Sequence, residues 1–323
     1  MARPSRGLVL AALTASLIVV GAVSGGMSAA VSAAVHRPAE VTEVTIVPPT
    51  IHSVTAAPDL SALLAEEQPP DMAHLEERLQ AYLKTLDGTW GVYVLDIDSG
   101  RTVAINADRP FLAASTFKVP MAMYVLSLVE RGRADLSDPV TYDPVDWEEG
   151  AGSLQSFVTE GSNFPVGELI ERAIVESDNI ATNMLVRHFG MANIRQFMRA
   201  LGGSVMVSEE GRNATTPREM AGYLEALYTR QAIEDRELRL HLLDLLQNTI
   251  YQQRIPAGVP ESVPVANKVG TLAGFVNDVG LVMLPRYPYI LSVYSEGVDE
   301  GPGTAAIAEI SRIVYEFQAG RLE

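Results

Sequence analysis

The sequence of 323 residues contains no cysteine, which excludes disulfide bonds, thiolate metal sites and a cysteine nucleophile. Basic residues are scarce as well: 24 lysines and arginines stand against 40 aspartates and glutamates, for a formal net charge of −16. A chain this acidic is unsuited to binding nucleic acid or an anionic membrane surface, and we expect neither as its main partner. The five histidines are scattered without metal-ligand spacing, so we expect no metal ion and no cofactor.

Hydrophobic residues make up 47% of the chain and charged residues 20%, the balance of an ordinary globular protein with a full core. At the N-terminus, Arg3 and Arg6 precede an uncharged stretch from Gly7 to Val35 that is apolar first and rich in Ala and Ser later. This order indicates an export signal, and its length also allows an uncleaved membrane anchor. We therefore expect residues 1–35 to be a signal peptide or anchor, and the protein to be extracytoplasmic, secreted or anchored to the cell membrane.

The rest of the chain divides into a linker and one domain. Residues 36–70 contain repeated prolines without an apolar period, which predicts a linker. Strand patterns lie near both ends of the domain over residues 71–323, at 91–97, 102–105, 263–269, 277–284 and 289–294. Helical patterns cover 72–86, 119–131, 166–189, 193–201, 216–228 and 304–317. This order predicts an α+β fold (an α/β/α sandwich), with an antiparallel sheet flanked by terminal helices and an inserted all-α subdomain.

Ser115 and Lys118 are three positions apart, at the start of a predicted helix. Positions i and i+3 share one face of a helix, so the lysine amine can lie beside the serine hydroxyl. A serine hydroxyl becomes a good nucleophile when a neighbouring base takes its proton, and a partly buried amine has a lowered pKa that suits this task. Taken alone, the pair fits a helical serine with a solvated lysine at least as well.

Two further motifs follow along the chain. Ser177-Asp178-Asn179 stands inside a helical pattern, either as a helix cap or as a turn that points a hydroxyl and an amide into a cleft. In the second case Ser177 relays a proton to a leaving nitrogen, and Asn179 holds a substrate carbonyl. Lys268-Val269-Gly270 lies in a predicted strand, where the lysine supplies positive charge and the glycine allows close approach of a substrate backbone. An exposed edge-strand lysine before a turn glycine is the alternative.

The three motifs, their order and their flanking residues resemble the penicillin-recognising serine hydrolases, and class A β-lactamases most closely. The resemblance extends from about Met72 to the C-terminus. It implies that Ser115 is the acylated nucleophile, Lys118 its base and Ser177 the proton relay. It also implies an oxyanion hole formed by the backbone N–H groups of Ser115 and Thr271, and a set of substrate-binding residues: Asn179, Lys268, Gly270 and Thr271.

Two features depart from the family's pattern. Val269 stands where the family has Thr or Ser, which removes a hydroxyl expected to bind the substrate carboxylate. The long loop that carries the deacylating glutamate in class A enzymes is reduced here to residues 202–214, without the Glu-Pro-x-Leu-Asn pattern. Glu209 and Glu210 lie in this segment, where they either replace that glutamate or form an exposed acidic turn, and we favour the turn. We therefore expect slow hydrolysis of the acyl-enzyme.

The sequence thus predicts an exported class A β-lactamase-like serine hydrolase that opens β-lactam amide bonds through an acyl-enzyme on Ser115. One alternative is a D,D-peptidase-like cell-wall enzyme that acts on a peptidoglycan stem peptide. Another is a penicillin-binding sensor or binding domain with little turnover. We expect a monomer that takes a small-molecule β-lactam or a stem peptide. The segment 147–149, Trp-Glu-Glu, either rims the cleft or is a surface loop.

Overall fold

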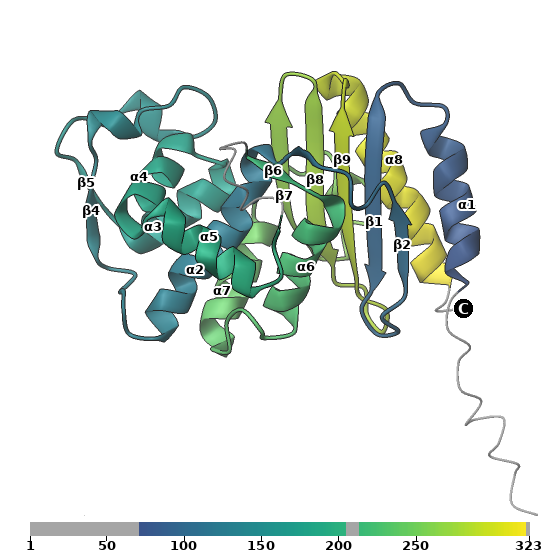
Figure 1. Ribbon diagram of the computed structural model, residues 1–323, viewed down its shortest axis with the longest axis horizontal. Helices are drawn as coiled ribbons and strands as arrows, with labels where there is room; N and C mark the ends of the chain where they lie inside the picture. The colour runs from purple at the N-terminus through teal and green to yellow at the C-terminus, as the bar shows by residue number, and fades with distance from the viewer. Residues whose placement is uncertain (1–70, 205–212, 321–323) are drawn as a thin grey trace, which may run out of the picture. The chain divides into compact units, whose positions relative to one another are not determined.

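A five-stranded antiparallel sheet with the order β2-β1-β9-β8-β7 organises the computed structural model, which describes residues 71–204 and 213–320 (Figure 1). Its strands are β1 (Thr89–Asp96), β2 (Thr102–Ile105), β7 (Val265–Leu272), β8 (Phe275–Val282) and β9 (Tyr289–Glu296). β1 pairs with β9 along its whole length, so strands from the two ends of the domain are neighbours in the sheet. β7 is left as an edge strand on the side of the helical part.

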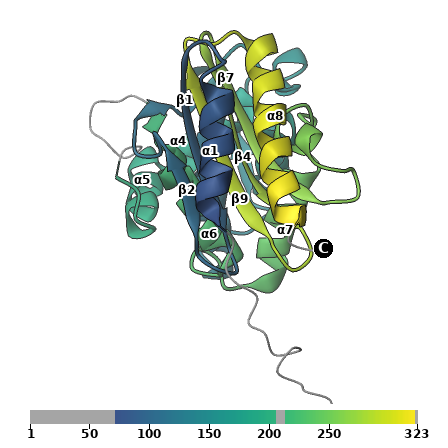
Figure 2. The ribbon, with the colours of Figure 1, turned by 90° about the vertical axis from the view of Figure 1, so that its right-hand side faces the viewer.

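Two terminal helices, α1 (Met72–Leu83) and α8 (Glu300–Ala319), pack against each other and cover one face of the sheet (Figure 2). Their apolar residues share a core with inward-facing residues of the strands, including Leu75, Leu79, Val92, Ile307 and Ile310. α6 (Pro217–Tyr228) contacts β1, β8 and β9, which places it on the other face. Because both faces are covered, seven of the eight residues of β1 are buried.

The helical part surrounds α2 (Lys118–Glu130), which is buried on nearly every side, as expected for a helix that is apolar all round. The remaining helices and turns are α3 (Val166–Glu171), α4 (Asn179–Phe189), α5 (Met191–Ala200), α7 (Arg236–Gln247), η2 (Ala114–Phe117), η3 (Pro144–Asp146), η4 (Leu154–Ser156), η5 (Arg172–Glu176) and η6 (Ile255–Gly258). Two small sheets pair β3 (Phe111–Leu112) with β6 (Ala214–Thr215) and β4 (Pro139–Thr141) with β5 (Asn163–Pro165). The predicted α+β architecture is confirmed.

The helical pattern predicted over 166–189 is broken at the second motif. α3 is followed by a single π-helical turn, η5, and the chain then bends at Ser177, whose φ of +59° and ψ of 32° are left-handed. Asp178 caps α4 by accepting the Ala181 N–H across 2.8 Å. The motif is therefore both a cap and a turn: its aspartate starts a helix while its serine and asparagine are left for other contacts.

Among the described residues, no helix combines the length and apolar character needed to cross a membrane. The predicted signal or anchor over residues 1–35, the predicted linker over 36–70, and Glu209 and Glu210 all lie outside the described residues.

Candidate active site

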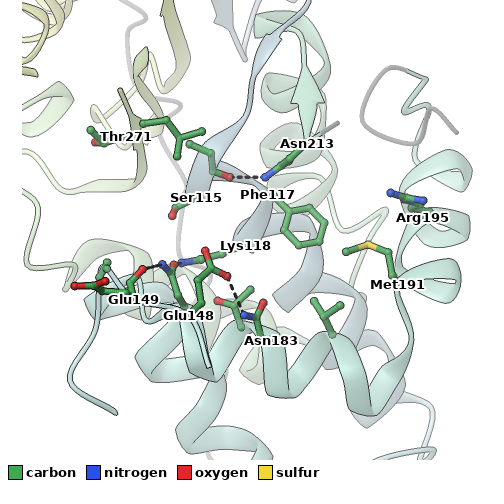
Figure 3. A pocket seen from close by; sticks show the side chains of 17 residues that line it. Ser115, Phe117, Lys118, Glu148, Glu149, Asn183, Met191, Arg195, Asn213 and Thr271 are labelled. Carbon is green, nitrogen blue, oxygen red and sulfur yellow. Dashed lines mark hydrogen bonds between the residues drawn. The ribbon is translucent and has the colours of Figure 1, made fainter. Parts of the chain in front are cut away.

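A cavity of about 590 Å³ lies where η2 and α4 meet the end of β7 (Figure 3). Each of the three motif regions supplies residues to its lining: Ser115, Lys118, Asn179 and Thr271. Ser177 and Lys268 are buried, with 3% and 0% of their surface exposed, and connect to the cavity through hydrogen bonds. The structure thus brings together the polar residues that the sequence singled out.

Ser115 occupies η2, the 3₁₀ turn that leads directly into α2. The residue before it, Ala114, has a φ of +49°, a left-handed conformation that is uncommon for a residue with a Cβ. Its carbonyl accepts a hydrogen bond of 3.0 Å from Asn213 Nδ2, and the Asn213 carbonyl accepts one of 2.7 Å from the Ala113 N–H, so the residue before β6 holds the turn from the side. A conformation of this kind persists only where the surroundings hold it, and here it presents the partly exposed Ser115 to the cavity.

Gly270 lies directly behind this turn. A Cβ at Gly270 would be 2.6 Å from the Ala113 carbonyl oxygen, a distance too short for any other residue unless the backbone moves, and 3.2 Å from the Ala114 Cβ, which is tight. The close approach is therefore one of protein to protein: the edge strand β7 packs against the turn that carries Ser115, backbone against backbone. This packing explains why a glycine is needed at position 270. The sequence had suggested another reason, the close approach of a substrate backbone.

Lys118 is 4% exposed, and its Nζ contacts the second motif three times. It donates to the Ser177 carbonyl across 2.6 Å and to Asn179 Oδ1 across 2.8 Å, and it lies 3.3 Å from Ser177 Oγ. Within the described part of the chain, Lys118 Nζ forms no hydrogen bond to Ser115 Oγ; only the backbone N–H of Lys118 donates to the Ser115 carbonyl. Burial lowers the pKa of Lys118 to about 8, although the Asp178 and Glu148 carboxylates act to raise it. A neutral amine has two N–H donors, which match the two short contacts and leave its lone pair for a proton from a hydroxyl.

Lys268 is one of only three lysines in the sequence, and it approaches the same serine as Lys118 does. Its Nζ donates to Ser177 Oγ across 2.9 Å. Burial lowers its pKa well below the ordinary value, and the positive charge of Lys118 acts in the same direction. The Ser177 hydroxyl therefore lies between two amines that are both easily deprotonated, an arrangement that can pass a proton.

Arg254 was not singled out from the sequence, but it holds the end of β7. Its Nη2 donates to Thr271 Oγ1 across 2.6 Å, and its Nη1 donates to the Gly270 and Asn277 carbonyls across 3.2 and 2.7 Å. Burial lowers the pKa of Arg254, while the Asp278 carboxylate acts to raise it. No local pattern marks this arginine, because its partners are on strands that follow it in the chain.

Val269, between Lys268 and Gly270, is 5% exposed and packs in the interior.

The segment 147–149 forms part of the cavity rim, through Glu148 and Glu149. Glu148 Oε2 accepts a hydrogen bond of 2.9 Å from Asn183 Nδ2 on α4, and the Glu149 carbonyl accepts one of 3.4 Å from Asn179 Nδ2. Figure 3 shows the Glu148 carboxylate turned toward Lys118 and the Glu149 side chain turned away from it. The cleft-rim interpretation therefore holds for Glu148 and Glu149, whereas Trp147 does not line the cavity and is 51% exposed.

Residues 74–318 match the model of the Beta-lactamase enzyme family, which is well over half of the chain. The chain belongs to this family. A beta-lactamase of Streptomyces albus G is 31% identical over 262 residues, which cover 75% of this chain and 83% of the relative. Beta-lactamase SME-1 of Serratia marcescens is 28% identical over 276 residues, covering 80% and 92% of the two chains.

Solved structures agree with this assignment. An ancestral class A β-lactamase superposes with a TM-score of 0.69 at 33% identity, covering 75% of this chain and 99% of the other. A mutant of PBP-A, solved as an acyl-enzyme complex with penicillin G, gives a TM-score of 0.72 at 28% identity, covering 77% and 98%. The family member described here is a class A β-lactamase-like serine hydrolase, an enzyme type that acts on amide bonds.

Proposed function

We propose that this protein is an exported hydrolase that opens β-lactam amide bonds through an acyl-enzyme on Ser115, and that hydrolysis of this acyl-enzyme is its slow step. The observation that carries the proposal is the convergence of Ser115, Lys118 and Ser177 on one cavity, with the lysine buried and its pKa near 8. The names of the relatives, all beta-lactamases, support the substrate class.

In the proposed acylation, neutral Lys118 accepts the hydroxyl proton while Ser115 Oγ attacks the lactam carbonyl carbon. The oxyanion that forms is stabilised by the backbone N–H groups of Ser115 and Thr271, which both line the cavity. The C–N bond then breaks, and the leaving nitrogen receives its proton from Ser177 Oγ. Lys118, 3.3 Å away, replaces that proton and returns to its neutral form.

Substrate binding is assigned to three motif residues and the strand end. Asn179 lines the cavity beside Lys118, and the buried Lys268 acts on the site through its hydrogen bond to Ser177 Oγ. The Thr271 hydroxyl accepts from Arg254, so its own proton is available to a substrate carboxylate. Gly270 contributes by allowing β7 to lie against the nucleophile turn.

A penicillin-binding protein with little turnover is the second candidate. It is favoured by the similarity to PBP-A, which superposes with a TM-score of 0.70 at 28% identity. The shortened segment between Leu201 and Thr215 also favours it, because hydrolysis of the ester needs a positioned base that acylation does not.

Intact-mass measurement of the full-length protein during exposure to penicillin G tests the proposal. We expect a burst of one acyl adduct per protein, located on the Ser115 peptide after digestion, followed by its slow loss. Ser115→Ala should form no adduct. Failure of the wild-type protein to form an adduct would contradict the acyl-enzyme, and linear turnover without a burst would contradict slow hydrolysis. An adduct that never decays would favour the penicillin-binding candidate.

The proposed export rests on the basic, apolar and small-residue order of the first 35 residues. We expect the mature chain outside the cytoplasm of its native host, or the full-length chain in the membrane fraction. Full-length protein in the soluble cytoplasmic fraction would contradict both forms.

A further inference from the structure

Hydrolysis of an ester by water is accelerated by a base that takes a proton from the attacking water. A carboxylate suits this role when it is held in place, reaches the cavity and can return its proton. Among the described residues, the acidic side chains that line the cavity are Glu148 and Glu149. The Glu148 carboxylate is turned toward Lys118, whereas the Glu149 side chain is turned away (Figure 3).

The position of Glu148 is fixed by α4, the helix that begins at Asn179. Asn183 Nδ2 donates to Glu148 Oε2 across 2.9 Å and to the Asp146 carbonyl across 3.2 Å, so one amide holds both the side chain and the loop that carries it. One turn further along α4, Arg187 donates to the two Asp146 carboxylate oxygens across 2.7 and 2.8 Å. A buried aspartate with a bidentate arginine is a strong anchor. The loop is therefore attached to the helix that also positions Asn179 beside Lys118.

Glu148 is also close enough to Lys118 to act on its charge, since its carboxylate raises the pKa of that amine. Glu148 itself is solvent-exposed, so a water molecule has access to its carboxylate. A base held by one amide and open to solvent is less well positioned than a buried one, so we expect it to give a slow but finite rate of hydrolysis.

We infer that Glu148 is the general base that hydrolyses the acyl-enzyme, in place of a glutamate from the segment before Thr215. This assignment rests on the proposed function, because it requires an ester on Ser115. Glu148 accepts a proton as the water oxygen bonds to the ester carbonyl carbon, and the ester C–O bond to Ser115 Oγ then breaks. The proton on Glu148 passes through the Lys118 amine to Ser115 Oγ, and the product leaves as a carboxylic acid that ionises in solvent.

The decisive experiment compares Glu148→Gln with Glu149→Gln in the full-length protein. A fluorescent penicillin gives the rate of acylation, and intact mass after removal of excess reagent gives the lifetime of the adduct. In Glu148→Gln we expect acylation close to wild type and hydrolysis slowed by about a hundredfold or more. In Glu149→Gln we expect both rates to stay close to wild type, since its side chain faces away from Lys118.

Each outcome separates this assignment from the proposed function. An adduct that forms on the wild-type protein and decays equally fast in Glu148→Gln would overturn the assignment and leave the acyl-enzyme intact. Equal slowing in both variants would overturn it as well, because a general loss of negative charge would then explain the effect. A shift of the pH profile of acylation to lower pH in Glu148→Gln, with unchanged hydrolysis, would overturn the assignment and show that Glu148 acts only through the pKa of Lys118. No adduct on the wild-type protein would overturn the proposed function itself.

Discussion

Lys118 Nζ donates to the Ser177 backbone carbonyl across 2.6 Å, which ties the first motif to the left-handed turn of the second. Ser177 has a positive φ at the point where η5 ends and before α4 begins, and its carbonyl is thereby outside both helices. The strained turn thus has a local purpose: it directs both an acceptor and a hydroxyl at one buried amine.

Lys118→Ala should slow acylation by about 10²–10⁴, the usual effect of removing a positioned acid–base group. In the wild-type protein the rate should rise with pH and level off above about pH 8, because only the neutral amine accepts a proton and the pKa of Lys118 is about 8. Stopped-flow measurements with a fluorescent penicillin give both results. Lys84→Ala, at an exposed lysine, is the control, and near-normal acylation in Lys118→Ala would show that the proton goes elsewhere.

Asn183→Leu tests the positioning of Glu148. Loss of the amide frees the carboxylate, so hydrolysis of the adduct should slow by about tenfold or more while acylation stays close to wild type. If Asn183 acts through Glu148, the double variant with Glu148→Gln should be no slower than Glu148→Gln alone. Additive losses of rate in the two single variants would show that Asn183 has a separate role.

Gly270→Ala should disrupt η2, the turn that carries Ser115. The added methyl would meet the Ala113 carbonyl oxygen at 2.6 Å, so either the turn or β7 must move. We expect a loss of about 1–3 kcal/mol in the free energy of unfolding, as for other overpacked sites, together with slower acylation. Gly222→Ala is the matched control: no heavy atom lies within 4 Å of its added methyl, and it should leave acylation unchanged. Thermal unfolding measures the stability of both variants, and labelling with a fluorescent penicillin measures their acylation rates. Equal stability and equal acylation in the two variants would contradict the prediction.

The free energy of unfolding should depend on pH because of the Asp278 carboxyl. Burial raises the pKa of this fully buried carboxyl to about 6, above its value in the unfolded chain. The folded state then binds the proton more tightly, so the stabilisation is complete below about pH 4 and is lost as the pH rises through 6. Relative to Asp278→Asn, the wild-type protein should lose on the order of 1–3 kcal/mol between pH 4 and pH 7.5. Denaturant unfolding at a series of pH values measures this difference, and parallel curves would contradict it.

The sequence predicted the elements whose signal is local. The strand predicted at 102–105 is observed as β2 with the same bounds, and the helix predicted at 119–131 is observed as α2, shifted by one residue. Ser115 and Lys118 were found in the same way, because a spacing of three residues is a property of the chain itself. The resemblance carried by the three motifs, their order and their flanking residues was sufficient to indicate the family to which the chain belongs.

The tertiary structure alone decided how the motifs act on one another. Lys268 reaches Ser177 across 91 positions of sequence, and Arg254 reaches Thr271 from a loop with no pattern of its own. Glu148 could be assigned to the cavity only once α4 was seen to hold it through Asn183. Short-range periodicity determines whether a segment is a helix or a strand, whereas a contact between distant segments depends on how their surfaces pack. The sequence therefore determined the candidate nucleophile and the family, and the fold decided which carboxylate of the cavity rim is turned toward Lys118 (Figure 3).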